Sequence, residues 1–118
     1  MATSRRIFVT GGLGFLNSGS TMIVPNTFVE ILSFVVPSGV QRKLSHVELS
    51  CRSEGLFQVL EDSAVIGSGR SAPGEPNPKF DWAPGHDVSE GSTIKVQFKA
   101  LPGTPANAVE AYLMGFDS

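Results

Sequence analysis

The segment Thr93–Leu101 alternates apolar and polar residues along its whole length. Ile94, Val96, Phe98 and Ala100 are separated by lysine and glutamine residues. Because a β-strand points successive side chains to opposite faces, this run predicts one apolar face and one solvent-exposed, basic face. The pattern is typical of a half-buried strand in an antiparallel sheet.

Similar short segments, separated by turn signals, fill most of the chain. We expect strands at Thr27–Val36, Gln41–Cys51, Leu56–Leu60, Ala64–Ile66, Phe80–Ala83, Thr93–Leu101 and Ala108–Phe116, and an eighth at Ile7–Val9 or Met22–Val24. Helix signals are nearly absent. The sequence therefore predicts an all-β fold, an antiparallel β-sandwich that is jelly-roll-like and has seven to eight strands.

Glycine and proline mark the expected loops and the domain boundary. Gly67–Lys79 is rich in both and predicts a long exposed loop, and Pro84–Gly91 predicts a turn region. The first part of the chain is polar and then rich in Gly, Ser and Thr. We interpret residues 1–22 as an extended N-terminal arm and residues 23–118 as the β-sandwich domain.

Composition limits the classes of partner. The 118 residues fit one domain. The net charge is −2, and the basic pairs Arg5–Arg6 and Arg42–Lys43 do not make the stripe that nucleic acid requires, so no nucleic-acid partner is expected. No apolar stretch is long enough for a spanning helix, so no membrane partner is expected either. Charged residues are 17% of the chain, which suggests that part of the surface is covered by a partner.

The residues capable of chemistry are scattered. His46 and His86 are far apart, His86-Asp87 is interpreted as a polar turn, and Glu61-Asp62 as a solvated hairpin tip. The single cysteine, Cys51, can form neither an intramolecular disulfide nor a cysteine metal site, and we expect it to be buried. We therefore predict no catalytic residues, no metal site and no cofactor, and a protein that is not an enzyme.

A short glycine-rich run resembles the start of extended short-chain dehydrogenases. Thr10-Gly11-Gly12-Leu13-Gly14 follows the short apolar run Ile7–Val9, as the dinucleotide motif requires. However, Asn17 stands where the last glycine belongs, and the following residues do not predict the required helix. We interpret the run as part of the glycine-rich arm.

Two of the aromatic residues allow a second function. Trp82 and Tyr112 can form a platform for stacking on a sugar ring, or they can belong to the core, where aromatic side chains are common. The sequence leaves both interpretations open.

Residues 24–117 resemble small β-sandwich proteins encoded by tailed bacteriophages and prophages. The resemblance follows the order of Leu32–Gly39, Leu44–Ser50, Leu56–Leu60, Arg70, Phe80–Trp82, Ser89–Val96 and Ala111–Phe116. It implies a structural virion protein, made in the host cytoplasm, that decorates the capsid surface as a cement protein. The implied partners are the major capsid protein and further copies of the chain in a trimer. The alternative is a carbohydrate- or receptor-binding sandwich of a phage tail or fibre.

The arm would supply contacts in such an assembly. Ile7, Phe8, Val9, Phe15 and Leu16 are apolar residues in a segment whose glycines prevent a self-contained element. We expect these five residues to bind a neighbouring subunit, where an extended segment can pair with an exposed strand edge.

Overall fold

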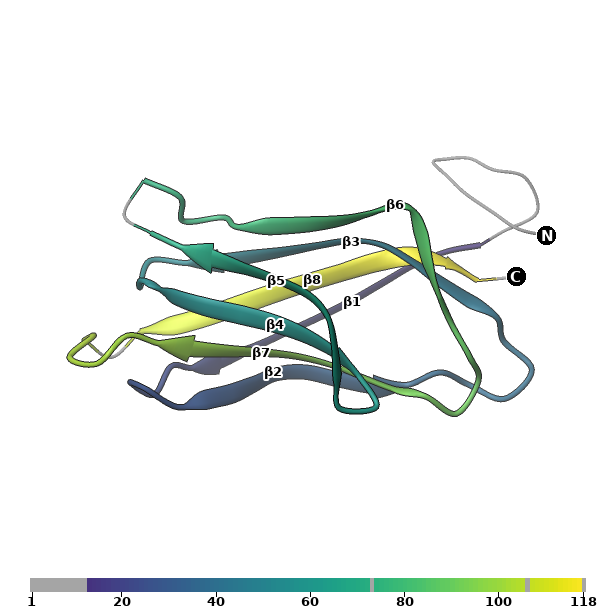
Figure 1. Cartoon of the computed structure of the whole chain (residues 1–118), viewed down its shortest axis with the longest axis horizontal. Helices are drawn as coiled ribbons and strands as arrows, with labels where there is room; N and C mark the ends of the chain where they lie inside the picture. The colour runs from purple at the N-terminus through teal and green to yellow at the C-terminus, as the bar shows by residue number, and fades with distance from the viewer. Residues whose placement is uncertain (1–12, 73, 106, 118) are drawn as a thin grey trace.

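The computed structural model describes residues 13–72, 74–105 and 107–117, and all of its regular elements are β-strands (Figure 1). The strands are β1 (Leu13–Met22), β2 (Phe28–Val35), β3 (Arg42–Cys51), β4 (Gly55–Glu61), β5 (Ala64–Ser71), β6 (Lys79–Val88), β7 (Thr93–Ala100) and β8 (Ala108–Asp117). No helix occurs within these residues. The prediction of an all-β fold is confirmed.

The strands form two packed sheets with a jelly-roll strand order. One sheet has the order β1-β8-β3-β6 and the other the order β2-β7-β4-β5. The first strand pairs with the last, the second with the seventh, the third with the sixth and the fourth with the fifth, all antiparallel. The strand pairs are therefore nested one inside another and fold over into two sheets. This is the jelly-roll arrangement that the sequence predicted.

The core lies between the sheets and follows the alternation seen in the sequence. Ile94, Val96 and Phe98 of β7 are fully buried, whereas Lys95 between them is exposed. The fully buried side chains of the other strands include Leu44, Val47 and Leu49 of β3, Phe57 and Val59 of β4, and Val109 and Leu113 of β8. These side chains from both sheets make one continuous hydrophobic cluster.

Two strands are longer than their sequence predicted. Gly67–Ser71, expected to begin a loop, continues β5 and pairs with β4. β6 runs through Pro84 to Val88, where a turn was expected. Pairing uses backbone groups, so glycine and serine can extend a strand without apolar alternation, and proline is tolerated because β6 is an edge strand.

The expected boundary of the arm at residue 22 is wrong for residues 13–22. These residues form β1 and pair with β8 over their whole length. A Cβ atom at Gly19 would lie 2.3 Å from the carbonyl oxygen of Ile31, so glycine allows β1 to approach β2 closely across the sandwich. Residues 1–12 of the expected arm lie outside the described residues.

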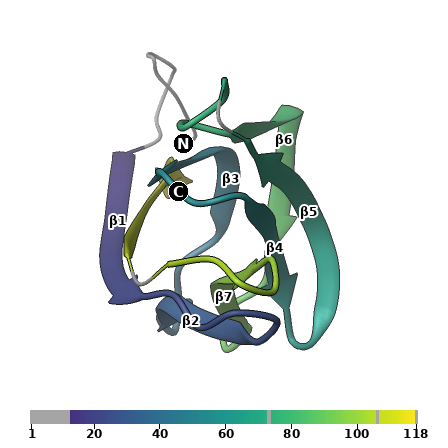
Figure 2. The ribbon, with the colours of Figure 1, turned by 90° about the vertical axis from the view of Figure 1, so that its left-hand side faces the viewer.

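The connections gather at the two ends of the sandwich. Four of them, which include residues 23–27, 52–54, 74–78 and 101–105, lie at one end, which we call the loop end (Figures 1 and 2). β1 begins and β8 ends at the opposite end, where Leu13 is paired with Asp117.

Candidate functional site

The predicted binding residues of the arm fall into two groups. Ile7, Phe8 and Val9 lie outside the described residues. Phe15 and Leu16 belong to β1, where their backbones pair with Gly115 and Met114 of β8. The sequence grouped all five as an arm, but the last two belong to a strand of the sandwich.

β1 differs from the other edge strands of the molecule. The four edges are β1 and β6 in one sheet, and β2 and β5 in the other. β2 contains Glu30, β5 contains Arg70, β6 contains two aspartates and Pro84, and the pairing of each of these strands has a register shift. β1 has no charged residue, no proline and no register shift. It therefore lacks the charge, the proline and the bulge with which the other edge strands are protected from further pairing.

The register shows which backbone groups of β1 point away from β8. The amide of Ile23 donates to the carbonyl oxygen of Asn107 at 2.9 Å, which places this pair in the hydrogen-bonded phase of the ladder. Because the phase alternates along antiparallel strands, Ser18 and Ser20 direct their N–H and C=O groups toward the open edge. Both residues are exposed, and Figure 2 shows β1 at the side of the sandwich away from β5 and β6.

Trp82 belongs to the packed interior at the opposite side. Its ring meets Phe80 edge-on, with 5.1 Å between the ring centroids, and packs against the core cluster. Its indole N–H donates to the carbonyl oxygen of Ile66 at 2.9 Å. Since Ile66 is in β5, this bond joins the edge strands of the two sheets. Trp82 therefore closes one side of the sandwich.

Tyr112 lies on the outer face of the same sheet. Its hydroxyl group donates to Oε1 of Glu110 at 3.1 Å, and that bond, with the negative charge of Glu110, raises the pKa of the tyrosine. Trp82 shares the inward face of β6 with Phe80, whereas Tyr112 points away from the core. The two rings lie on opposite faces of one sheet, so the structure does not form the platform that the alternative interpretation requires.

The two histidines contact carboxylates within their own sheet and across the sandwich. His46 of β3 hydrogen-bonds Asp81 of β6, and its Nε2 lies 3.3 Å from Oε1 of Glu48. His86 Nε2 lies 2.8 Å from Oε1 of Glu61, which is in the other sheet. The expectation of a polar turn at His86-Asp87 is therefore wrong, because both residues belong to β6. Glu61 is also half-buried and bonded, where a solvated hairpin tip was expected.

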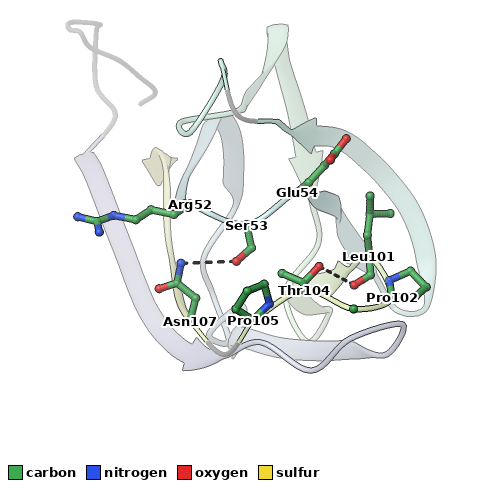
Figure 3. Close-up of a pocket in the computed structure, with 9 residues that line it drawn as sticks. Arg52, Ser53, Glu54, Leu101, Pro102, Thr104, Pro105 and Asn107 are labelled. Atoms are coloured by element: carbon green, nitrogen blue, oxygen red, sulfur yellow. Dashed lines mark hydrogen bonds between the residues drawn. The ribbon is translucent and has the colours of Figure 1, made fainter.

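The loop end contains an open hollow of about 380 Å³ between two connections (Figure 3). It is lined by Arg52, Ser53, Glu54, Leu101, Pro102, Gly103, Thr104, Pro105 and Asn107. Several of its polar groups already bond one another. Asn107 Nδ2 donates to Ser53 Oγ at 3.5 Å, and Thr104 Oγ1 donates to the carbonyl oxygen of Leu101 at 2.6 Å. Three exposed apolar side chains, Met22, Val24 and Leu101, lie at the same end.

Cys51 is buried, as the sequence predicted. Burial raises the pKa of its thiol, and hydrogen bonds with Ser53 oppose that effect. A protonated thiol inside the core is a poor nucleophile. Among the residues that the structure describes, no group of three or more His, Cys, Asp or Glu side chains is arranged to hold a metal ion. No helix able to span a membrane occurs in that part of the chain.

Comparison with solved structures gives only distant similarity. No protein-family model and no curated protein matches the sequence. Among solved structures, the chain is similar to the insecticidal delta-endotoxin Cry8Ea1 of Bacillus thuringiensis, with 15% sequence identity and a TM-score of 0.39. The match covers 89% of this chain and 19% of the toxin, so the chain spans about a fifth of that protein.

Proposed function

We propose that this protein is a structural virion protein of a tailed bacteriophage, a decoration or cement protein that binds the lattice of major capsid protein and stabilises the head. Its role in this proposal is contact between subunits, without catalysis. The resemblance of residues 24–117 to small phage β-sandwich proteins supports it. The jelly roll supports it by architecture, since viral capsid domains use this fold, although lectin domains do as well.

The open edge of β1 is the observation that carries the proposal. A strand of ten residues without charge, proline or register shift can accept a further strand from a neighbouring chain. Backbone pairing of this kind depends little on side-chain identity. It therefore suits a lattice, in which many equivalent contacts of modest strength act together through their high effective concentration.

The heat resistance of phage shells tests the proposal. Shells that lack the protein are heated with and without a saturating amount of it, and the temperature of disassembly is recorded. A protein that binds assembled shells stabilises them by mass action, so the decorated shells should disassemble at a higher temperature. Equal disassembly temperatures would contradict the proposal.

A substitution at Ser20 tests the role of the edge. In Ser20→Pro the lost N–H group points away from β8, so the pairing within the sheet is retained while one donor of the open edge is removed. Ser20→Ala changes the side chain and keeps the donor. The proline variant should bind shells more weakly than the alanine variant, at equal thermal stability of the isolated protein. Equal binding by the two variants would show that the open edge of β1 does not take part in binding to shells.

A receptor- or carbohydrate-binding role in a tail or fibre is the second candidate, and the hollow at the loop end favours it. Arg52, Glu54 and Asn107 bring charged and amide groups to its wall, where a polar ligand could bind. If this role holds, Arg52→Ala should abolish attachment to host cells and leave the binding of shells unchanged.

A further inference from the structure

The outer face of the β2-β7-β4-β5 sheet carries an organised basic surface. In the register of this sheet, one row across the four strands consists of Phe28, Lys99, Leu56 and Arg70. We call these four residues the basic row. Lys99 and Arg70 are two strands apart, which corresponds to roughly 10 Å.

Neither cation of the basic row has an ion-pair partner among the residues that the structure describes. Lys99 Nζ lies 5.0 Å from the centroid of the Phe28 ring, a cation–π contact that leaves its charge intact. Arg70 is exposed and forms no ion pair among the described residues. Lys95, which lies four residues before Lys99 on the same face of β7, is partly balanced by Glu30 at 3.9 Å. The uncompensated charge of this face is therefore concentrated at Lys99 and Arg70.

Apolar side chains accompany these cations. Leu56 lies between them in the row and is half-buried. Val35 and Val65 on the same face are 57% and 53% exposed. Exposed apolar side chains beside an aromatic ring and an arginine offer a protein partner both apolar contact area and a charge to pair with. Two uncompensated cations are too few for the extended phosphate contacts of a nucleic acid.

The opposite face of the sandwich has the reverse charge. On the outer face of the β1-β8-β3-β6 sheet, the described residues provide four carboxylates, Glu48, Glu110, Asp81 and Asp87, against the two lysines Lys43 and Lys79. A partner with an acidic surface would be attracted to one face and repelled by the other. This difference in charge determines that the β2-β7-β4-β5 face, and not the opposite face, is oriented toward such a partner.

We propose that the basic row docks on an acidic, partly apolar protein surface, and that this surface belongs to the capsid lattice. The inference rests on the proposed function and adds to it the docking face and the charge of the partner. Leu56, between the two cations, and Phe28, at the end of the row, would supply the apolar part of the contact. Lys99 and Arg70 would pair with carboxylates of the lattice.

Matched charge reversals on the two faces test this inference. The double variant K99E/R70E reverses the basic row, and K43E/K79E makes the same change in net charge on the opposite face. Each variant is first compared with the wild-type protein by thermal unfolding. Binding to purified empty shells that lack the protein is then measured by co-sedimentation at several salt concentrations.

The inference predicts weaker binding by on the order of tenfold or more for K99E/R70E, because like charges would then face each other in the contact. Binding by K43E/K79E should stay within about twofold of wild type, and added salt should weaken the wild-type protein more than K99E/R70E. Equal binding by K99E/R70E and wild type, or an equal loss in both double variants, would overturn the inference while leaving the proposed function intact. If the wild-type protein does not bind shells, both fail. Binding of duplex DNA or anionic vesicles in place of shells, lost in K99E/R70E, would also overturn the inference.

Discussion

Arg42 and Asp117 are joined by two hydrogen bonds at the end of the sandwich where β8 finishes. Nε donates to Oδ1 at 2.6 Å and Nη2 donates to Oδ2 at 2.8 Å. The Arg42 side chain is only 10% exposed, and its guanidinium carbon lies 5.1 Å from the ring centroid of Phe34 in the other sheet. The pair therefore ties the last residues of β8 to β3 and to the opposite sheet.

Asp117→Asn should lower the free energy of unfolding by about 1–3 kcal/mol, because it removes a charged acceptor from a partly buried guanidinium. The matched control is Asp87→Asn, since Asp87 is 85% exposed and lies 3.6 Å from Lys43. That change should cost less than about 0.5 kcal/mol. Urea denaturation of both variants measures the difference, and equal losses would show that the Arg42–Asp117 pair contributes no more than a surface pair.

Gly69→Ala should be strongly destabilising because of the close approach of a core ring. A Cβ atom at Gly69 would lie 2.3 Å from Cε2 of Phe57, whose side chain is fully buried in the core. We expect a loss of about 1–3 kcal/mol. A Cβ atom at Gly74 would have nothing within 4 Å, so Gly74→Ala should be nearly neutral. Chemical denaturation compares the two variants, and a neutral Gly69→Ala would contradict the described packing of Phe57.

The stability of the protein should fall in alkaline solution through Cys51. Burial raises the pKa of this thiol above its ordinary value of 9.0, so the folded state keeps the proton that the unfolded chain releases first. The contribution is fully present below the unfolded pKa and is lost as the pH rises through the folded pKa.

Cys51→Ala isolates this effect from other titrations. Tyr112, whose pKa is also raised, is retained in both proteins and cancels in the comparison. The stability advantage of wild type over Cys51→Ala should shrink as the pH rises above about 9. An advantage that stays constant with pH would show that the thiol pKa is the same in the folded and unfolded states.

The sequence predicted the strands in which apolar and polar side chains alternate. It missed the strand segments that lack this alternation and pair only through their backbone groups. Thr93–Leu101 was identified by its period of two, and its apolar residues are the centre of the core. β1 lacks that signal because Asn17, Ser18 and Gly19 interrupt any apolar alternation, although the strand pairs with β8 through its backbone. It was therefore interpreted as part of an arm.

The basic row and the aromatic positions were harder to predict than the strands, because they depend on which strands are neighbours in the sheets. Lys99 and Arg70 belong to one row through pairing with β4, and their separation in sequence gives no indication of it. Trp82 and Tyr112 were grouped by residue type, but strand order and register place their rings on opposite faces. The signal that could have identified the edge was present in the sequence, as the absence of charge and proline in Leu13–Met22.

Co-sedimentation of the purified protein with empty phage shells that lack it tests the central claim most directly. The account predicts saturable binding, with a fixed number of copies per capsid subunit at saturation and weaker binding by Ser20→Pro than by Ser20→Ala. Protein that stays in the supernatant at every shell concentration, while its circular dichroism shows an intact β-sandwich, would contradict the claim that this jelly roll is a capsid decoration protein.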